Sequence, residues 1–160
     1  MIDDGWHVLT LVAAIGAGLN GGVFFAFSSF VMRAIDRLPG SQSISAMQAI
    51  NVEAPTPKFM TLFLGTAVAC GVLVVGAITR LDEVASRYQL AGGLTYLLAI
   101  VITAGYHIPR NNALDRVDPT VPDADAVWRR YSRTWTAGNH LRTLVCTAGA
   151  VLLTLAFRVQ

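Results

Sequence analysis

The sequence predicts an all-α fold, a four-helix transmembrane bundle with short amphipathic interfacial helices in its two longer connections. Of the 160 residues, 54% are hydrophobic and only 14% are charged, and the mean hydropathy of +0.53 exceeds that of typical soluble domains. Three stretches of about the 20 residues that a spanning helix requires contain no charged side chain. No repeat or second domain is visible, so residues 1–160 are expected to form a single integral membrane domain.

The four predicted spans are residues 8–32, 59–79, 90–108 and 141–158. The first three follow the uncharged stretches, and the fourth is a shorter apolar run between Arg142 and Arg158. The long stems of these arginines can place their charges at the two interfaces. The first span is too long for the apolar region of a signal peptide, and acidic residues precede it. We therefore expect it to remain in the mature chain.

Basic residues predict how the bundle is oriented. Connections with more Lys and Arg usually stay in the cytoplasm. In this chain the connections after the first and third spans carry most of the basic residues. The opposite side holds only Arg80, Arg87 and Arg158. Both termini are thus predicted to be non-cytoplasmic, in a multi-pass protein of the cell (inner or plasma) membrane. No basic tract or aromatic motif indicates nucleic-acid binding. The protein is expected to be surrounded by membrane lipid.

Small residues of the first span predict close helix packing. Its GxGxxG pattern lies in the middle of a span, where no dinucleotide site can form. Ala14, Gly18, Gly22 and Ala26 recur every fourth residue and would let another helix approach, including one from a second copy in a homo-oligomer. Asn20 is expected to form a hydrogen bond to another helix or, alternatively, to line a pocket.

The first connection predicts a short amphipathic helix. Ser41 or Ser43 can cap it, and prolines 55 and 57 can terminate it. Such a helix lies at the interface or folds back over the bundle. Its apolar positions recur three apart, at Ile44, Met47 and Ile50, and its polar side chains are Gln48, Asn51 and Glu53.

Polar residues gather at the cytoplasmic ends of the third and fourth spans. Tyr96, Thr103 and His107 share one face that should point into the bundle. Pro109 is expected to end or kink the third helix and to turn the next three residues across the bundle mouth. After Asp123 or Asp125 a helix should begin, bent at Gly138, with one continuous face: Trp128, Tyr131, Trp135, Asn139 and Arg142.

Five blocks of the chain resemble a known family. They are FFAFSSFVMRAIDRLP, AMQAIN, FMTLFLGT, IPRNNAL and WTAGNHLRT. Together they are similar, over essentially the whole chain, to the small four-helix membrane proteins grouped with the anthrone oxygenases. This resemblance implies a cofactor-independent oxygenase that converts an anthrone, or another hydrophobic phenolic substrate, to a quinone with molecular oxygen.

The polar residues suit that chemistry independently. Removing a proton from an anthrone gives an electron-rich anion, so a protein needs a base, donors for the oxyanion and flat apolar walls. His140 or His107 is the expected base, because imidazole titrates near neutral pH. The expected substrate-binding residues are Arg110, Asn111, Asn112, Asn139, Arg142, Trp135, Tyr131 and Asn51.

Three other interpretations use the same residues. His107, Asn111, Asn139, His140 and Arg142 could simply tie the third helix to the fourth by hydrogen bonds. His107, His140 and Glu53 could hold iron or copper, and the two imidazoles could hold haem, although the first interpretation expects no metal or cofactor. A third alternative is a non-enzymatic partner subunit that docks through the small-residue face.

Overall fold

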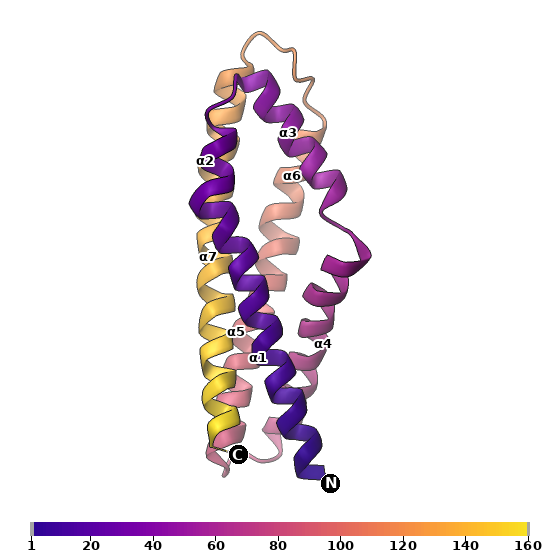
Figure 1. Cartoon of the computed structure of the whole chain (residues 1–160), viewed down its shortest axis with the longest axis vertical. Helices are drawn as coiled ribbons and strands as arrows, with labels where there is room; N and C mark the ends of the chain where they lie inside the picture. The colour runs from indigo at the N-terminus through magenta and orange to yellow at the C-terminus, as the bar shows by residue number, and fades with distance from the viewer. Residues whose placement is uncertain (1, 160) are drawn as a thin grey trace.

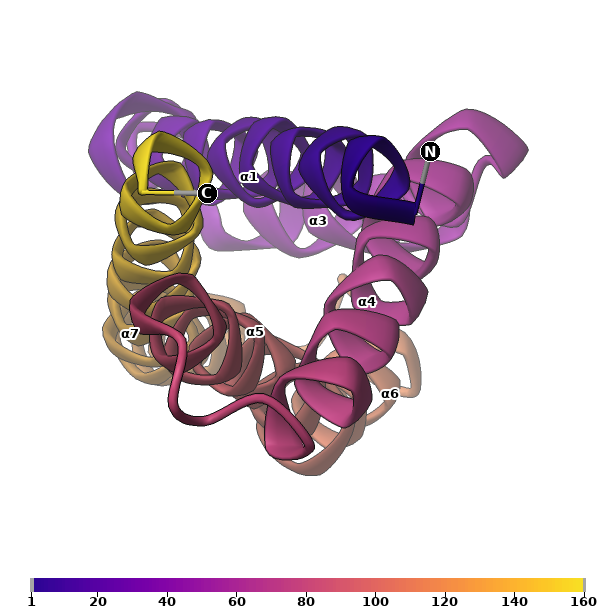
Figure 2. The same ribbon diagram turned by 90° about the horizontal axis from the view of Figure 1, so that it is seen from below.

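Four long helices stand side by side and enclose the core of the protein in a computed structural model (Figure 1; Figure 2). The structure describes residues 2–159, with side chains from residue 5 onward. All four helices are long and apolar enough to cross a membrane. The chain is therefore a multi-pass membrane protein, and the predicted all-α fold class is confirmed. Its elements are α1 (Ile2–Ala26), η1 (Phe27–Val31), α2 (Met32–Ile35), α3 (Gly40–Glu53), α4 (Pro57–Ile78), α5 (Val84–Ile102), η2 (Thr103–His107), α6 (Ile108–Asp115) and α7 (Ala124–Arg158).

The two elements η1 and η2 are π turns inside otherwise continuous helices. The first long helix runs through α1, η1 and α2, and the third through α5, η2 and α6. In η2 the N–H of Ile108 bonds to the carbonyl of Thr103, five residues earlier. Pro109 then occupies the first turn of α6, where a missing N–H is tolerated. Pro109 was predicted to end or kink the third helix; an end at this residue is wrong, since the helix continues to Asp115.

The fourth helix begins where it was predicted to begin and is continuous. α7 begins after Asp123 and continues without interruption past Gly138 to Arg158. A Cβ at Gly138 would collide with the ring of Tyr106 and would lie 3.1 Å from His107. This glycine therefore allows close packing instead of a bend. In the second connection the helical residues belong to α6 and to the start of α7, and no separate interfacial helix lies between them.

The first connection does fold back over the bundle. α3 lies across its upper end, close to α6 and α7 (Figure 1). Gln48 Nε2 donates to the carbonyls of Leu114 and Val117, at 2.9 Å each. Ser43 donates to the carbonyl of Ile35 at 2.9 Å instead of capping α3. The backbone N–H of Gly40 is held by Asp125 Oδ1 at 2.7 Å, so α3 is tied to both helices of the mouth.

Two apolar clusters fill the bundle and leave a polar layer between them. The lower cluster includes Leu73 and Cys146, and the upper one includes Met47 and Trp135. Along α7, the buried residues between Trp135 and Cys146 are Asn139 and Arg142. The predicted inward face of this helix is confirmed, since all five of its residues are buried. The polar layer is where a site can form.

Glycines set the closest helix contacts, but not the predicted ones. Within the chain, Gly16 faces the side chain of Thr66, and Gly21 faces Thr147. Gly18 and Gly22 point outward and are exposed, so the close approach predicted at these two residues is not made by a neighbouring helix of this chain. Their use by a second copy stays a prediction. Asn20 Nδ2 donates to the carbonyl of Gly16 in its own helix, at 2.8 Å; the expected bond to another helix was wrong.

Replacing Gly92 with leucine should destabilise the protein by about 2 kcal/mol. A Cβ there would lie 2.9 Å from Leu153 Cγ and 3.1 Å from the backbone nitrogen of the same residue in α7, so α5 and α7 would have to separate. Gly65→Leu is the matched control, because nothing lies within 4 Å of its Cβ position. Thermal unfolding in mild detergent measures both. Equal melting temperatures for the two variants would contradict this account of α5–α7 packing.

Candidate functional site

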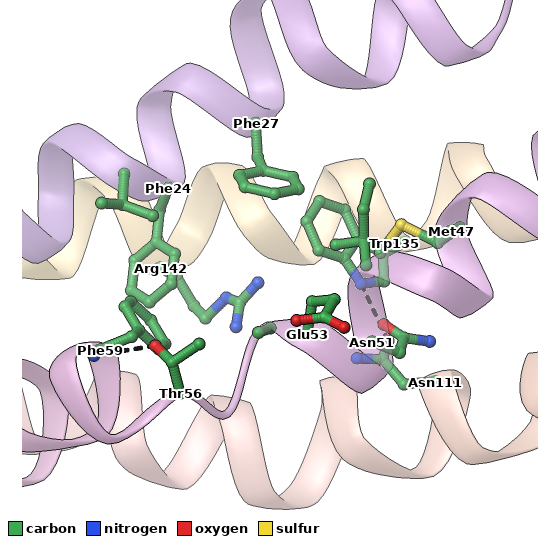
Figure 3. Close-up of a pocket in the computed structure, with 13 residues that line it drawn as sticks. Phe24, Phe27, Met47, Asn51, Glu53, Thr56, Phe59, Asn111, Trp135 and Arg142 are labelled. Carbon is green, nitrogen blue, oxygen red and sulfur yellow. Dashed lines mark hydrogen bonds between the residues drawn. The ribbon is translucent and has the colours of Figure 1, made fainter.

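A cavity of about 410 Å³ opens below α3, at the level of the polar layer (Figure 3). Its volume falls within the range of about 300 to 1,000 Å³ typical of small-molecule sites. Side chains from α1, η1, α3, α4, α6 and α7 line it. They are Val23, Phe24, Phe27, Met47, Ile50, Asn51, Glu53, Ala54, Thr56, Phe59, Asn111, Trp135 and Arg142.

Arg142 places a buried positive charge at this cavity. Its side chain is only 6% exposed. Nη2 donates to Asn139 Oδ1 at 2.6 Å and Nη1 to Thr103 Oγ1 at 3.3 Å, while the guanidinium carbon lies 4.3 Å from the centre of the Phe24 ring. Nε is buried without a protein partner. Among the described side chains no carboxylate forms an ion pair with it, so the charge is available to an anionic ligand.

Asn139 holds this arginine and is itself fixed by the first long helix. Its Nδ2 donates to the carbonyl of Phe24 and to Ser28 Oγ, at 2.6 Å each. Ser28 belongs to the π turn η1, and Thr103, the other partner of Arg142, begins the π turn η2. π turns interrupt the regular bonding of an α-helix and frequently occur at functional sites. The two π turns therefore lie near the arginine in two different helices that both pack against α7.

Asn111 presents an amide donor to the cavity. Its Oδ1 accepts from Tyr131 Oη and from Trp135 Nε1, both at 3.0 Å. An indole nitrogen can only donate, so the atom that it meets must be the amide oxygen. The Nδ2 group has no acceptor among the described residues and can therefore donate to a ligand. Tyr131 and Trp135 thus orient Asn111.

Glu53, at the end of α3, brings a carboxylate to the same cavity. It is exposed, and Figure 3 shows its carboxylate and the guanidinium of Arg142 pointing toward one another. Asn51 lies two residues nearer the start of α3, and its Nδ2 donates to Asp115 Oδ1 at 2.9 Å. The cavity therefore combines one cationic, one anionic and two amide side chains.

Aromatic rings supply a large part of the remaining wall. Phe24, Phe27, Phe59 and Trp135 line the cavity. The Phe27 and Trp135 rings are 5.9 Å apart at their centres, and Phe59 stacks at 5.9 Å on Phe63. The three phenylalanines were not among the predicted site residues. The only signal was their position, two of them in FFAFSSF and Phe59 two residues after Pro57. Such a position is equally typical of lipid-facing residues.

Neither predicted base lines the cavity. His107 is buried against Trp135, with Nε2 3.4 Å from its carbonyl oxygen and the ring centres 5.3 Å apart. His140 is exposed and lines a different cavity, beside Asp36 and Arg133. His140 points outward because Asn139 points inward, and the next residue of an α-helix is rotated by about 100° about the helix axis. The histidine assignments therefore do not agree with the geometry.

Four other predicted contacts also lie outside the cavity lining. Arg110 donates to the carbonyl of Tyr106 at 2.9 Å and stacks 3.4 Å over its ring. Asn112 is exposed. Tyr131 and Asn139 do not line the cavity but form hydrogen bonds to Asn111 and Arg142, which do. Of the eight predicted substrate contacts, the lining includes Asn51, Asn111, Trp135 and Arg142.

The alternative metal ligands are not brought together. His107 packs within the bundle, Glu53 lines the cavity, and His140 lines a separate one. In the described part of the chain, no group of three or more His, Cys, Asp or Glu residues is placed to hold a metal ion. This geometry does not favour the three-residue ligand set, and a bound metal stays an alternative prediction. The alternative of a haem held by two imidazoles is not favoured either, because His107 and His140 lie apart.

A comparison with protein families identifies the relatives of this chain. The family model described as anthrone oxygenase matches residues 59–152, more than half of the sequence. The match includes Phe59, Asn111 and Arg142, whereas Phe24 and Glu53 precede it. No curated protein and no solved structure matches the chain. With the family model covering the helices that carry Asn111 and Arg142, the chain belongs to the anthrone oxygenase family.

Proposed function

We propose that the protein is a membrane oxygenase that converts an anthrone-like, or another hydrophobic phenolic, substrate to a quinone with molecular oxygen. The observation that carries the proposal is the buried guanidinium of Arg142, which faces the carboxylate of Glu53 in an aromatic-walled cavity (Figure 3). Family membership supports the oxygenase class. The absence of a cofactor is part of the proposal.

The walls suit a flat, uncharged ring system. Phe24, Phe27 and Trp135 offer ring faces and edges, which pack favourably on other aromatic groups. Arg142 would then meet the substrate oxygen, and Asn111 Nδ2 would donate to a second phenolic or carbonyl oxygen. Such a substrate partitions into lipid. The cavity is lined by side chains of the helices that cross the membrane.

The reaction begins with a proton transfer. Glu53 removes a proton from the methylene carbon, and the electron pair moves onto the carbonyl oxygen, where the fixed positive charge of Arg142 stabilises it. A carboxylate can act on such a carbon acid when strong donors hold the oxyanion that forms. We assign the base to Glu53 instead of His107 or His140, since the carboxylate is the one of the three that lines the cavity.

Oxygen completes the conversion without another reactant. The anion transfers electrons to dioxygen, and a carbon–oxygen bond forms at the former methylene to give a hydroperoxide. Loss of the remaining proton from that carbon breaks the O–O bond and releases hydroxide, which is protonated to water. One anthrone and one dioxygen thus give one quinone and one water. The site needs to bind the substrate, stabilise its anion and move protons.

The orientation in the membrane is also a proposal. The mouth covered by α3 would face the cytoplasm, because most Lys and Arg residues lie at that end. Both termini would then lie on the other side. A bound metal or haem and a role as a partner subunit remain alternative predictions, but the separation of His107, His140 and Glu53 favours neither metal nor haem.

Replacing Arg142 with methionine should lower kcat/KM for anthrone oxidation by about 100- to 1,000-fold, the typical effect of removing an oxyanion donor. Arg142→Lys should retain part of the rate, and Arg130→Met, on the exposed face of α7, should match wild type. The assay follows oxygen uptake and quinone absorbance above autoxidation, with melting temperatures as a folding control. Wild-type protein without activity, or with one metal or haem per chain by elemental analysis and visible absorption, would contradict the proposal.

Glu53→Gln should lower the same rate by about 100-fold or more, the usual contribution of a general base. The exposed position of Glu53 predicts an unchanged melting temperature, and Glu83→Gln at the far end of the bundle is the matched control. Deuterium exchange into the anthrone methylene under anaerobic conditions isolates the proton transfer. Exchange as fast in Glu53→Gln as in wild type would remove Glu53 from the role of base.

The orientation predicts which end of the bundle reacts with a membrane-impermeant thiol reagent. Gln42→Cys in α3 should be protected in intact cells and labelled after lysis, while Asp82→Cys, in the turn between α4 and α5, should be labelled in both. Both positions are exposed, and the native Cys70 and Cys146 are buried. The reverse labelling pattern would show that the termini are cytoplasmic.

A further inference from the structure

A second cavity, of about 390 Å³, lies on the outer surface where α2 meets α7. It is separate from the site described above and shares no lining residue with it. Three of its side chains are basic and exposed: Arg33, Arg133 and His140. In the described part of the chain neither arginine forms an ion pair or donates a hydrogen bond to the protein. The cavity therefore holds cationic groups without a protein partner.

The one carboxylate in the lining is already engaged. Asp36 Oδ1 accepts from Trp128 Nε1 at 2.9 Å and from Ser132 Oγ at 2.8 Å. These bonds anchor the end of α2 to α7 and direct the carboxylate into the seam between the helices. The donors facing outward around it are the two guanidinium groups, which match phosphate oxygens well. An anionic group is the complementary ligand.

The outer face of α7 continues from this cavity toward the opposite end of the bundle. His140, Leu144, Thr147 and Val151 follow one another at steps of four, three and four, so they share one face with Arg133. Farther along, Thr147, Val151 and the outward-facing Gly18 line another cavity of about 340 Å³ between α1 and α7. With no Cβ at Gly18, the surface between these two helices is hollowed.

We propose that this surface binds one anionic phospholipid, with its phosphate at Arg33 and Arg133 and an acyl chain along the seam between α1 and α7. Charge and depth both point to a lipid. The basic cavity lies just beyond the uncharged part of the first span, where headgroups begin, and the hollow below it faces the hydrocarbon region. Basic pockets between spanning helices on the cytoplasmic side bind anionic headgroups in this way.

Lipid titration monitored by native mass spectrometry of the purified protein tests the proposal. Phosphatidylglycerol should bind about 30-fold more tightly than phosphatidylcholine, as expected for two arginines near a headgroup. Arg33→Gln/Arg133→Gln should abolish that preference. The control Arg37→Gln/Arg129→Gln removes the same charge from exposed residues outside the cavity and should preserve it. Glycerol phosphate should not displace the lipid, because it lacks an acyl chain.

A separate variant tests the acyl-chain part of the surface. Gly18→Leu should weaken phosphatidylglycerol binding while leaving the melting temperature of the lipid-free protein unchanged, since the nearest atom to a Cβ there is Ala150 Cβ at 3.9 Å. Equal binding of the two lipids by wild type, or an undiminished preference in Arg33→Gln/Arg133→Gln, would overturn the proposal. A dimer of wild type that Gly18→Leu dissociates would assign the surface to a second copy instead.

Discussion

A guanidinium buried among aromatic rings is the constraint around which the mouth of this bundle is organised. Removing an arginine from water carries a penalty of several kcal/mol unless the protein supplies hydrogen bonds or an opposite charge. Here Asn139 and Thr103 provide two acceptors, and the faces of Phe24 and Trp135 provide weaker attraction. No carboxylate neutralises Arg142 directly among the described residues. The arrangement is therefore most stable when an anionic oxygen is bound, which is what an oxyanion site requires.

The two π turns explain how three helices can serve one arginine. Each π turn adds a residue to its helix and so changes which face the following residues present. In the third long helix, η2 separates Thr103, which reaches Arg142, from Asn111, which lines the cavity. In the first, η1 carries Ser28, which holds Asn139. The close approach that these contacts need is possible because Gly138 leaves room for Tyr106 and His107 against α7.

The sequence was most informative where a single physical requirement decides the outcome. Uncharged stretches long enough to cross a membrane predicted three of the spans, and a shorter apolar run between two arginines predicted the fourth. The three-to-four spacing from Trp128 to Arg142 predicted the inward face of α7. The π turns could not be predicted, because an inserted residue leaves no periodic signal in a short apolar helix. That omission explains why Pro109 was expected to end the helix and why His107 was expected to line the cavity.

The candidate site was only half predictable for a related reason. Asn111, Trp135 and Arg142 are polar or amphipathic residues at the end of a span, so their presence there requires an explanation. The phenylalanines that form the walls resemble any lipid-facing residue, and only the tertiary structure shows that Phe24 and Phe27 face inward. Glu53 was noticed as a carboxylate, but its role depends on how far α3 folds back over the mouth.

Neighbouring residues of α7 show how one helix can serve two environments. Asn139 is completely buried and positions the arginine of the cavity, while His140, the next residue, lies on the outer surface with Arg133. Because consecutive helix residues diverge by about 100°, the motif NH could not place both side chains in one site.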